Sequence, residues 1–198
     1  MKIYHLYNGM LSPDDLYEIS QKLVAGAVMV HPTDTCYGLA CDIRNQEAVN
    51  TIYAIKQRSF SKPLSALISS LDMAFDYGVL SERAIDLAVH AWPGRLTLVV
   101  PKKEGLENCF VGTQKSIGLR VPMCSTARQI VSAIYSPLAT TSVNNTGQPE
   151  VYNESDAIAF AKKHSDQIGI CIVAGDLPFH PVSRIVGVSE ESAWIIRK

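Results

Sequence analysis

The sequence predicts an α/β protein with an open, twisted, mixed β-sheet and flanking helices. Strand-like apolar runs and amphipathic helical patterns are interspersed along all 198 residues. Several neighbouring strands have no helix between them, which favours a mixed sheet over a strict βαβ alternation. The chain is 47% hydrophobic and 19% charged, a composition that supports a packed core in a single domain spanning residues 1–198.

The first predicted helix begins at Ser12-Pro13-Asp14-Asp15, which supplies a cap, a proline and two acids for the first turn. Apolar residues at 16, 19 and 23 then recur at helical spacing. The next elements of this half are a buried strand over 28–30, a helix through 49–53 that ends near Lys56, a strand over 64–68, and a helix that opens at 81–83 and stops at Pro93-Gly94.

The second half of the chain is richer in predicted strands. The strands over 96–100 and 117–121 each end at a proline, which cannot donate to the sheet. The remaining predicted elements are a helix over 126–134, a strand over 138–143, a helix over 154–163, a strand over 168–173, and final strands over 184–188 and 193–197.

Charge and apolar patterning exclude several classes of protein. The formal net charge of −1 provides no global positive field for nucleic acid, so any RNA contact must come from a local patch. We expect no transmembrane helix, because no run of 18 apolar residues occurs, and the N-terminus lacks a signal-peptide apolar region. These observations predict a cytoplasmic protein with no membrane association.

The five cysteines are scattered without a C-x-x-C pair, and the five histidines show no paired metal spacing. We therefore predict reduced thiols and assign no metal-ligating residues. Cys36 lies in a polar segment and is a candidate nucleophile. No histidine lies near it in a recognisable pattern, so we favour an ordinary buried thiol.

Polar side chains gather where the strand over 28–30 should end. Pro32 removes a backbone donor, so the chain leaves the sheet there. The hydroxyls of Thr33, Thr35 and Tyr37 and the carboxylate of Asp34 follow. Short polar side chains just past a strand suit a small polar ligand better than a core.

Three further sites carry polar side chains that have two or three interpretations each. Lys56, Arg58 and Lys62 follow a helix and form either an anion site or a solvated helix end, since the chain has no Walker A loop. Ser142 and Asn144 share one face of a strand, although the segment beginning at Asn144 also has the composition of a turn. Arg120 interrupts an apolar strand and must face solvent, a carboxylate or a cavity.

Three of these segments together resemble the YrdC/Sua5-like family of threonylcarbamoyl-AMP synthases. The matching motifs are Pro32 to Leu39 (P-T-[DE]-T-x-Y-G-L), Lys56-x-Arg58 with Lys62-Pro63-Leu64, and Ser142-x-Asn144. The resemblance runs from about residue 12 to the C-terminus, in order and at fitting spacing. It implies a single-domain member of the TsaC type, in which the twisted sheet surrounds a large, concave, basic cavity.

The resemblance implies an L-threonylcarbamoyladenylate synthase, a nucleotidyltransferase that converts L-threonine, bicarbonate and ATP to threonylcarbamoyl-AMP and pyrophosphate. The product serves N6-threonylcarbamoylation of adenosine 37 in tRNA, together with the tRNA threonylcarbamoyltransferase machinery. ATP is a substrate, and Mg²⁺ is expected to bridge its phosphates. The implied roles are catalysis and ATP binding for Lys56 and Arg58, ATP binding for Ser142, Asn144, Ser183 and Arg197, threonine binding for Thr33, Thr35 and Tyr37, and binding of either substrate for Arg120.

Three positions depart from the family pattern. Leu67 replaces a histidine, Arg184 a threonine and Gly187 an aspartate. If Arg184 and Gly187 face the cavity, the site is more positive than the family norm, which predicts strong ATP binding and weak threonine binding. These departures leave two alternatives open: a diverged paralogue with another substrate, and a module that binds double-stranded RNA or tRNA without this activity.

Overall fold

The computed structural model describes residues 1–106, 109, 111, 113, 115–145 and 147–198. Its strands form a ten-stranded sheet in the order β1-β8-β2-β3-β7-β4-β6-β5-β9-β10, with both parallel and antiparallel neighbours. The strands are β1 (Lys2–His5), β2 (Val28–His31), β3 (Gly38–Asp42), β4 (Ser65–Leu67), β5 (Leu96–Pro101), β6 (Ser116–Arg120), β7 (Leu138–Ser142), β8 (Ile168–Val173), β9 (Arg184–Val188) and β10 (Ala193–Arg197).

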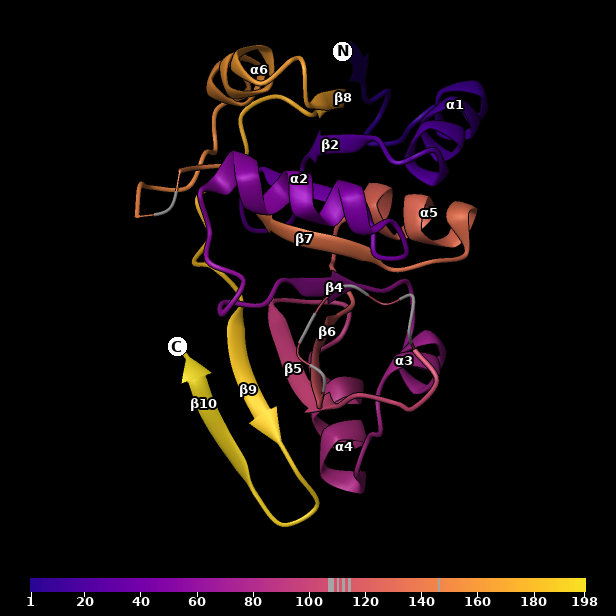
Figure 1. Cartoon of the computed structure of the whole chain (residues 1–198), viewed down its shortest axis with the longest axis vertical. Coiled ribbons are helices and arrows are strands. Elements are labelled where there is room, and N and C mark those ends of the chain that lie inside the picture. Colours follow the sequence, from indigo (N-terminus) through magenta and orange to yellow (C-terminus); the bar gives the residue numbers. More distant parts are fainter. Residues whose placement is uncertain (107–108, 110, 112, 114, 146) are drawn as a thin grey trace.

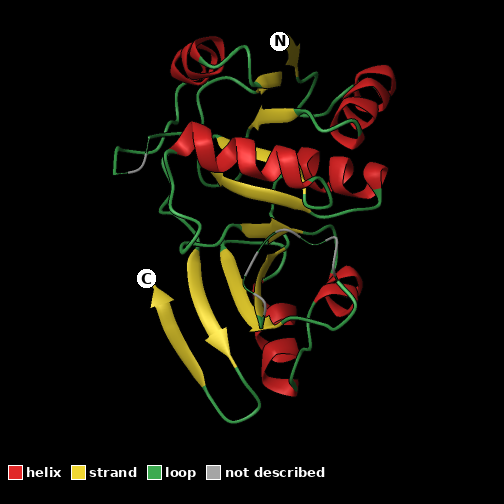
Figure 2. Cartoon of the chain, viewed as in Figure 1, coloured by secondary structure: helices red, strands yellow, loops and turns green. Residues whose placement is uncertain are grey.

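The sheet twists strongly between its two halves. In Figure 1, β2, β7 and β4 run across the view, whereas β5, β6, β9 and β10 run along its long axis. The helices are α1 (Pro13–Val24), α2 (Gln46–Lys56), α3 (Leu71–Tyr77), α4 (Glu82–Ala91), α5 (Ser125–Ile134) and α6 (Glu154–Lys163). Figure 2 shows α3 and α4 beside the second half and the other helices around the first.

Alternation along the strands divides the core into two layers. In β3, Leu39 and Cys41 belong to the layer that also contains α2, whereas Ala40 joins the layer under α1 and α5. In β7, Leu138 lies in the α1/α5 layer. Thr140 and Ser142 share its face of the strand, because side chains two residues apart point the same way. This face therefore changes from apolar to polar along β7.

The predicted fold class is confirmed, because the sheet is mixed, open and flanked by helices. Three elements lie outside the predicted set: β1, β3 and α3. β3 is buried along its whole length and therefore lacks the polar alternation that indicates a strand. α3 is seven residues long, and β1 is a four-residue edge strand, so neither shows enough periods of its pattern.

Candidate functional site

A cavity of about 240 Å³ lies on the polar part of this sheet face. Small polar side chains from successive strands form its floor, including Ser65, Thr97, Thr140 and Ser142. The strand register places Ser65 directly opposite Thr140, and Gly38 opposite Ser142. Small residues leave room for a ligand above the sheet, and their hydroxyls supply hydrogen bonds to it. The floor thus suits a polar ligand.

The loop between β2 and β3 forms one wall of the cavity. Thr33 organises it, since its Oγ1 accepts hydrogen bonds from the backbone N–H groups of Thr35 and Cys36. Thr33 and Thr35 line the cavity, and their hydroxyl oxygens are 2.9 Å apart. The structure therefore brings together two of the three residues predicted for the threonine side.

Tyr37 is the exception among those three. Its side chain is fully buried, and its hydroxyl donates to the carbonyl of Gly175 at 2.7 Å and accepts from the N–H of Ala174 at 3.0 Å. It belongs to the hydrophobic core and is not among the described residues that line the cavity. The expectation that Tyr37 contacts a substrate is wrong for this structure, because its hydroxyl is hydrogen-bonded to the backbone that follows β8.

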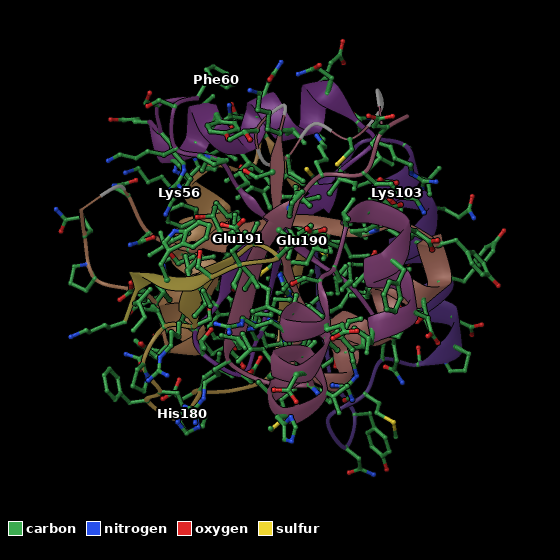
Figure 3. All side chains as sticks on the ribbon, turned by 90° about the horizontal axis from the view of Figure 1, so that it is seen from below. Lys56, Phe60, Lys103, His180, Glu190 and Glu191 are labelled. Atoms are coloured by element: carbon green, nitrogen blue, oxygen red, sulfur yellow. The ribbon has the colours of Figure 1, made fainter. Side chains whose placement is uncertain are left out.

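Lys56 is buried at the end of α2, and its ammonium holds the segment after β7. Nζ donates to the carbonyl of Ser142 at 2.8 Å, and to both the carbonyl and the side-chain oxygen of Asn144. The Ser142 hydroxyl also donates to that side-chain oxygen, at 2.7 Å. Burial, aided by the charge of Arg58, lowers the pKa of Lys56 to about 8. Figure 3 places Lys56 and Phe60 on the side of the molecule away from Lys103.

Two arginines bring further positive charge to the lining. Arg58 follows the left-handed Gln57 and is held by the carbonyls of Lys62 and Pro63, at 2.8 and 3.2 Å. Arg197 reaches in from β10 and donates from Nε and Nη2 to the carbonyl of Ser183, at 3.0 and 2.6 Å. Both predicted nucleotide-binding residues line the cavity, although Arg58 precedes β4 in the middle of the sheet order and Arg197 lies in the edge strand β10.

Arg120 faces both a carboxylate and the cavity, which are two of the three possibilities left open by the sequence. Its Nη2 forms an ion pair with Asp34 Oδ2 at 2.7 Å, and its Nε donates to the carbonyl of Gly94 at 2.9 Å. Arg120 also lines the cavity. Because Asp34 follows β2 and Arg120 ends β6, the ion pair connects the two halves of the sheet.

Glu150 and Leu67 also line the cavity. Among the described lining residues, Glu150 is the one carboxylate, beside Lys56, Arg58, Arg120 and Arg197. Sequence reasoning missed Glu150 because it lies in a loop outside every motif, and it missed Thr97 and Thr140 because each looks like an ordinary strand residue. The alternation of Leu138, Thr140 and Ser142 was the available signal.

The two C-terminal departures do not make the cavity more positive. Arg184 is exposed and is not among the described lining residues, since its neighbour Ile185 takes the cavity side of β9. Gly187 lies under Trp194: a Cβ at Gly187 would come within 2.3 Å of the indole ring. Gly187 shares the face of Ile185 but is covered by Trp194 and is not among the described lining residues. The condition that both positions face the cavity is therefore not met, and Leu67 is the departure that reaches the site.

All five cysteines are free thiols, as predicted. Cys36 lines the cavity, and burial raises the pKa of its thiol to about 11. A protonated thiol is a poor nucleophile, which agrees with the interpretation of Cys36 as an ordinary buried residue. The described residues contain no cluster of three or more metal-ligating side chains. Every helix in the described part of the chain is too short or too polar to cross a membrane.

The fold and the cavity define an α/β protein whose open sheet carries a polar cavity lined by several cationic side chains. Residues 21–198 match the model of the Sua5/YciO/YrdC family, which is described as telomere recombination. The match covers most of the chain, so this protein belongs to the Sua5/YciO/YrdC family.

Solved structures of other proteins are similar over nearly the whole chain. Sua5 of P. abyssi in complex with L-threonine matches with a TM-score of 0.88 and 25% identity, over 100% of this chain and 57% of that one. This chain thus spans less than two thirds of the length of that Sua5. E. coli YciO matches with a TM-score of 0.87 and 20% identity, covering 100% of this chain and 95% of that one. MTH1692 of Methanobacterium thermoautotrophicum matches with a TM-score of 0.73 and 26% identity, over 94% and 87% of the two chains.

Proposed function

We propose that this protein is an L-threonylcarbamoyladenylate synthase that serves tRNA modification. The observation that carries the proposal is that one cavity is lined both by the residues expected to bind ATP and by two threonines expected to bind the amino acid. The first group is Lys56, Arg58, Ser142, Asn144 and Arg197, and the second is Thr33 and Thr35. Membership of the family and the similarity to a Sua5 that binds L-threonine support the same substrates.

The residue chemistry suits this reaction. The threonine amine and bicarbonate form a carbamate with loss of water, and a carbamate oxygen then attacks the α-phosphate of ATP and releases pyrophosphate. The protein then needs to position two substrates and neutralise phosphate charge, and needs no nucleophile of its own. Arg58 and Arg197 provide planar donors for phosphate oxygens, and Lys56 provides a compact charge. The high pKa of the Cys36 thiol fits a reaction without thiol chemistry.

A magnesium ion would fit this arrangement through its usual ligands. Mg²⁺ is commonly held by one or two carboxylates together with substrate phosphates. Glu150 is the carboxylate that lines the cavity, and the nucleotide would supply the remaining charged ligands. When bound, the ion would neutralise charge on the phosphates.

The proposal is tested by product formation from purified protein. We expect an AMP-linked product and pyrophosphate from ATP only when both L-threonine and bicarbonate are present. Turnover that persists after careful removal of bicarbonate would contradict the proposed reaction. Leu67 lines the cavity in place of the family histidine, so the assay should include the other amino acids. Turnover with another amino acid and none with threonine would favour a diverged paralogue.

A further inference from the structure

The cavity contains arginines in two different electrostatic settings. Arg120 forms an ion pair with Asp34, and the two side chains are only 8% and 13% exposed. Arg58 and Arg197 bond to backbone carbonyls, and neither forms an ion pair with any described acid. The charge of Arg120 is therefore compensated locally, whereas the charges of Arg58 and Arg197 are available to a ligand.

The geometry of the ion pair also determines which part of Arg120 can bind. The edge formed by Nε and Nη2 is occupied by the Gly94 carbonyl and Asp34 Oδ2. No acceptor in the described part of the chain bonds Nη1, which leaves the outer edge of the guanidinium for a ligand. A guanidinium edge with two parallel N–H groups matches either a carboxylate or a phosphate group, so the charge around Arg120 has to distinguish between them.

From these observations we propose that Asp34 is a specificity-determining residue that reserves Arg120 for the singly charged carboxylate of the amino-acid substrate and keeps phosphate groups away from it. The inference rests on the proposed function, because it presupposes an amino acid and a nucleotide in one cavity. A polyphosphate seeks uncompensated positive charge, which Arg58 and Arg197 offer. At Arg120, the Asp34 carboxylate repels a multiply charged anion more strongly than a single carboxylate.

The surroundings of the second carboxylate oxygen of Asp34 are consistent with this role. Oδ1 is buried and has no hydrogen-bond partner among the described residues. A buried acceptor without a hydrogen-bond donor lowers stability, so the ion pair with Arg120 offsets only part of the cost of burying Asp34. A full negative charge on Asp34, undiminished by further donors, gives the strongest repulsion toward phosphate.

Competition between ligands tests the proposal with the full-length protein. L-threonine binding is measured by calorimetry with and without inorganic phosphate, in the wild type and in Asp34→Asn. We expect phosphate to weaken threonine binding less than about twofold in the wild type and about tenfold in Asp34→Asn, because the amide no longer repels phosphate from Arg120. Asp34→Glu should restore the wild-type behaviour.

Asp42→Asn is the matched control. Asp42 is also a buried carboxylate in an ion pair, with Arg44 at 2.6 Å, but neither residue is among the described cavity-lining residues. It should lower stability without changing the competition. Equal competition in the wild type and Asp34→Asn, or the same change in Asp42→Asn, would overturn the inference.

A second variant keeps the test decisive if Asp34→Asn does not fold. Arg120→Lys retains the charge but loses the planar edge, so threonine binding should fall about tenfold while phosphate binding stays within about twofold. Unchanged threonine affinity in Arg120→Lys would contradict the assignment of Arg120. A wild type that binds no threonine would instead reject the proposed function, and this inference with it.

Discussion

At the scale of single residues, the two cations of the K-x-R motif have different surroundings. Lys56 is buried and holds the backbone after β7, whereas Arg58 lies in a loop and, within the described part of the chain, donates hydrogen bonds only to two neighbouring carbonyls. A substitution at Lys56 therefore changes both the fold and the site. Arg58 is the position at which ligand binding can be tested separately from stability.

We predict that Arg58→Ala weakens ATP binding about ten- to a hundredfold, because a charge-assisted contact to phosphate contributes about 1.5–3 kcal/mol. Its melting temperature should remain close to that of the wild type. Calorimetric titration with ATP measures the first effect and thermal unfolding the second.

Lys103→Ala is the control, since Lys103 is an exposed cation on the other side of the molecule from Lys56 (Figure 3) and is not among the described lining residues. It should bind ATP like the wild type. A loss of affinity that is equal in both variants would indicate a diffuse charge effect instead of a contact from Arg58.

At the scale of elements, the β9–β10 hairpin lies at the exposed edge of the sheet and contributes residues to one wall of the cavity. All of β10 is exposed, and Figure 1 shows the hairpin extending away from the helices. Its Arg197 nevertheless bonds Ser183 inside the cavity. Trp194 packs over Gly187 of the neighbouring strand, so the position of the hairpin depends on the missing side chain at Gly187.

We predict that Gly187→Ala destabilises the protein by about 1–3 kcal/mol, because the added methyl group overlaps the Trp194 ring. ATP binding should also weaken, since Arg197 lies on the displaced strand. Urea unfolding and ATP titration measure the two effects.

Gly169→Ala provides a comparison at another strand glycine. Its Cβ would meet only the Ala27 methyl, at 3.4 Å, so it should be tolerated. Adding Trp194→Ala to Gly187→Ala should recover part of the lost stability. If Gly187→Ala is as stable as the wild type, the hairpin does not depend on this contact.

At the scale of the whole molecule, the cavity lies where the two halves of the sheet meet. Ser142 and Thr140 come from the first half, and Thr97, Ile185 and Arg197 from the second. A ligand bound there contacts both halves at once. Binding should therefore stabilise the domain as one cooperative unit.

We predict that ATP at about 100 times its dissociation constant stabilises the protein by about 2.7 kcal/mol and raises its melting temperature by about 5–10 °C in a single transition. Differential scanning calorimetry with and without ATP measures this shift. Two separate transitions, with only one responding to ATP, would contradict a site shared by both halves. Arg58→Ala should shift less than the wild type at the same ATP concentration.

The sequence by itself predicted the fold class, most of the helices and strands, and the positions of the motifs. The patterns of the strands over 96–100 and 168–173 indicate strands directly, because strand and helix periods are local properties. The mixed sheet followed from neighbouring strands with no helix between them. Lys56, Arg58, Ser142 and Arg120 were candidates from the sequence, because short motifs are visible along the chain, but their roles came only from the resemblance to a family. β3 was not, because its uniform burial leaves no period to detect.

Only the tertiary structure decided which of these residues meet. It buried Tyr37 in the core, placed Arg184 outside the described lining and brought Glu150 into the cavity. The pairing of Asp34 with Arg120 joins residues 86 positions apart, which no local pattern encodes. The physical reason is that a local sequence window specifies the period of each strand, whereas strand order and register specify which side chains share a face and lie within hydrogen-bonding distance.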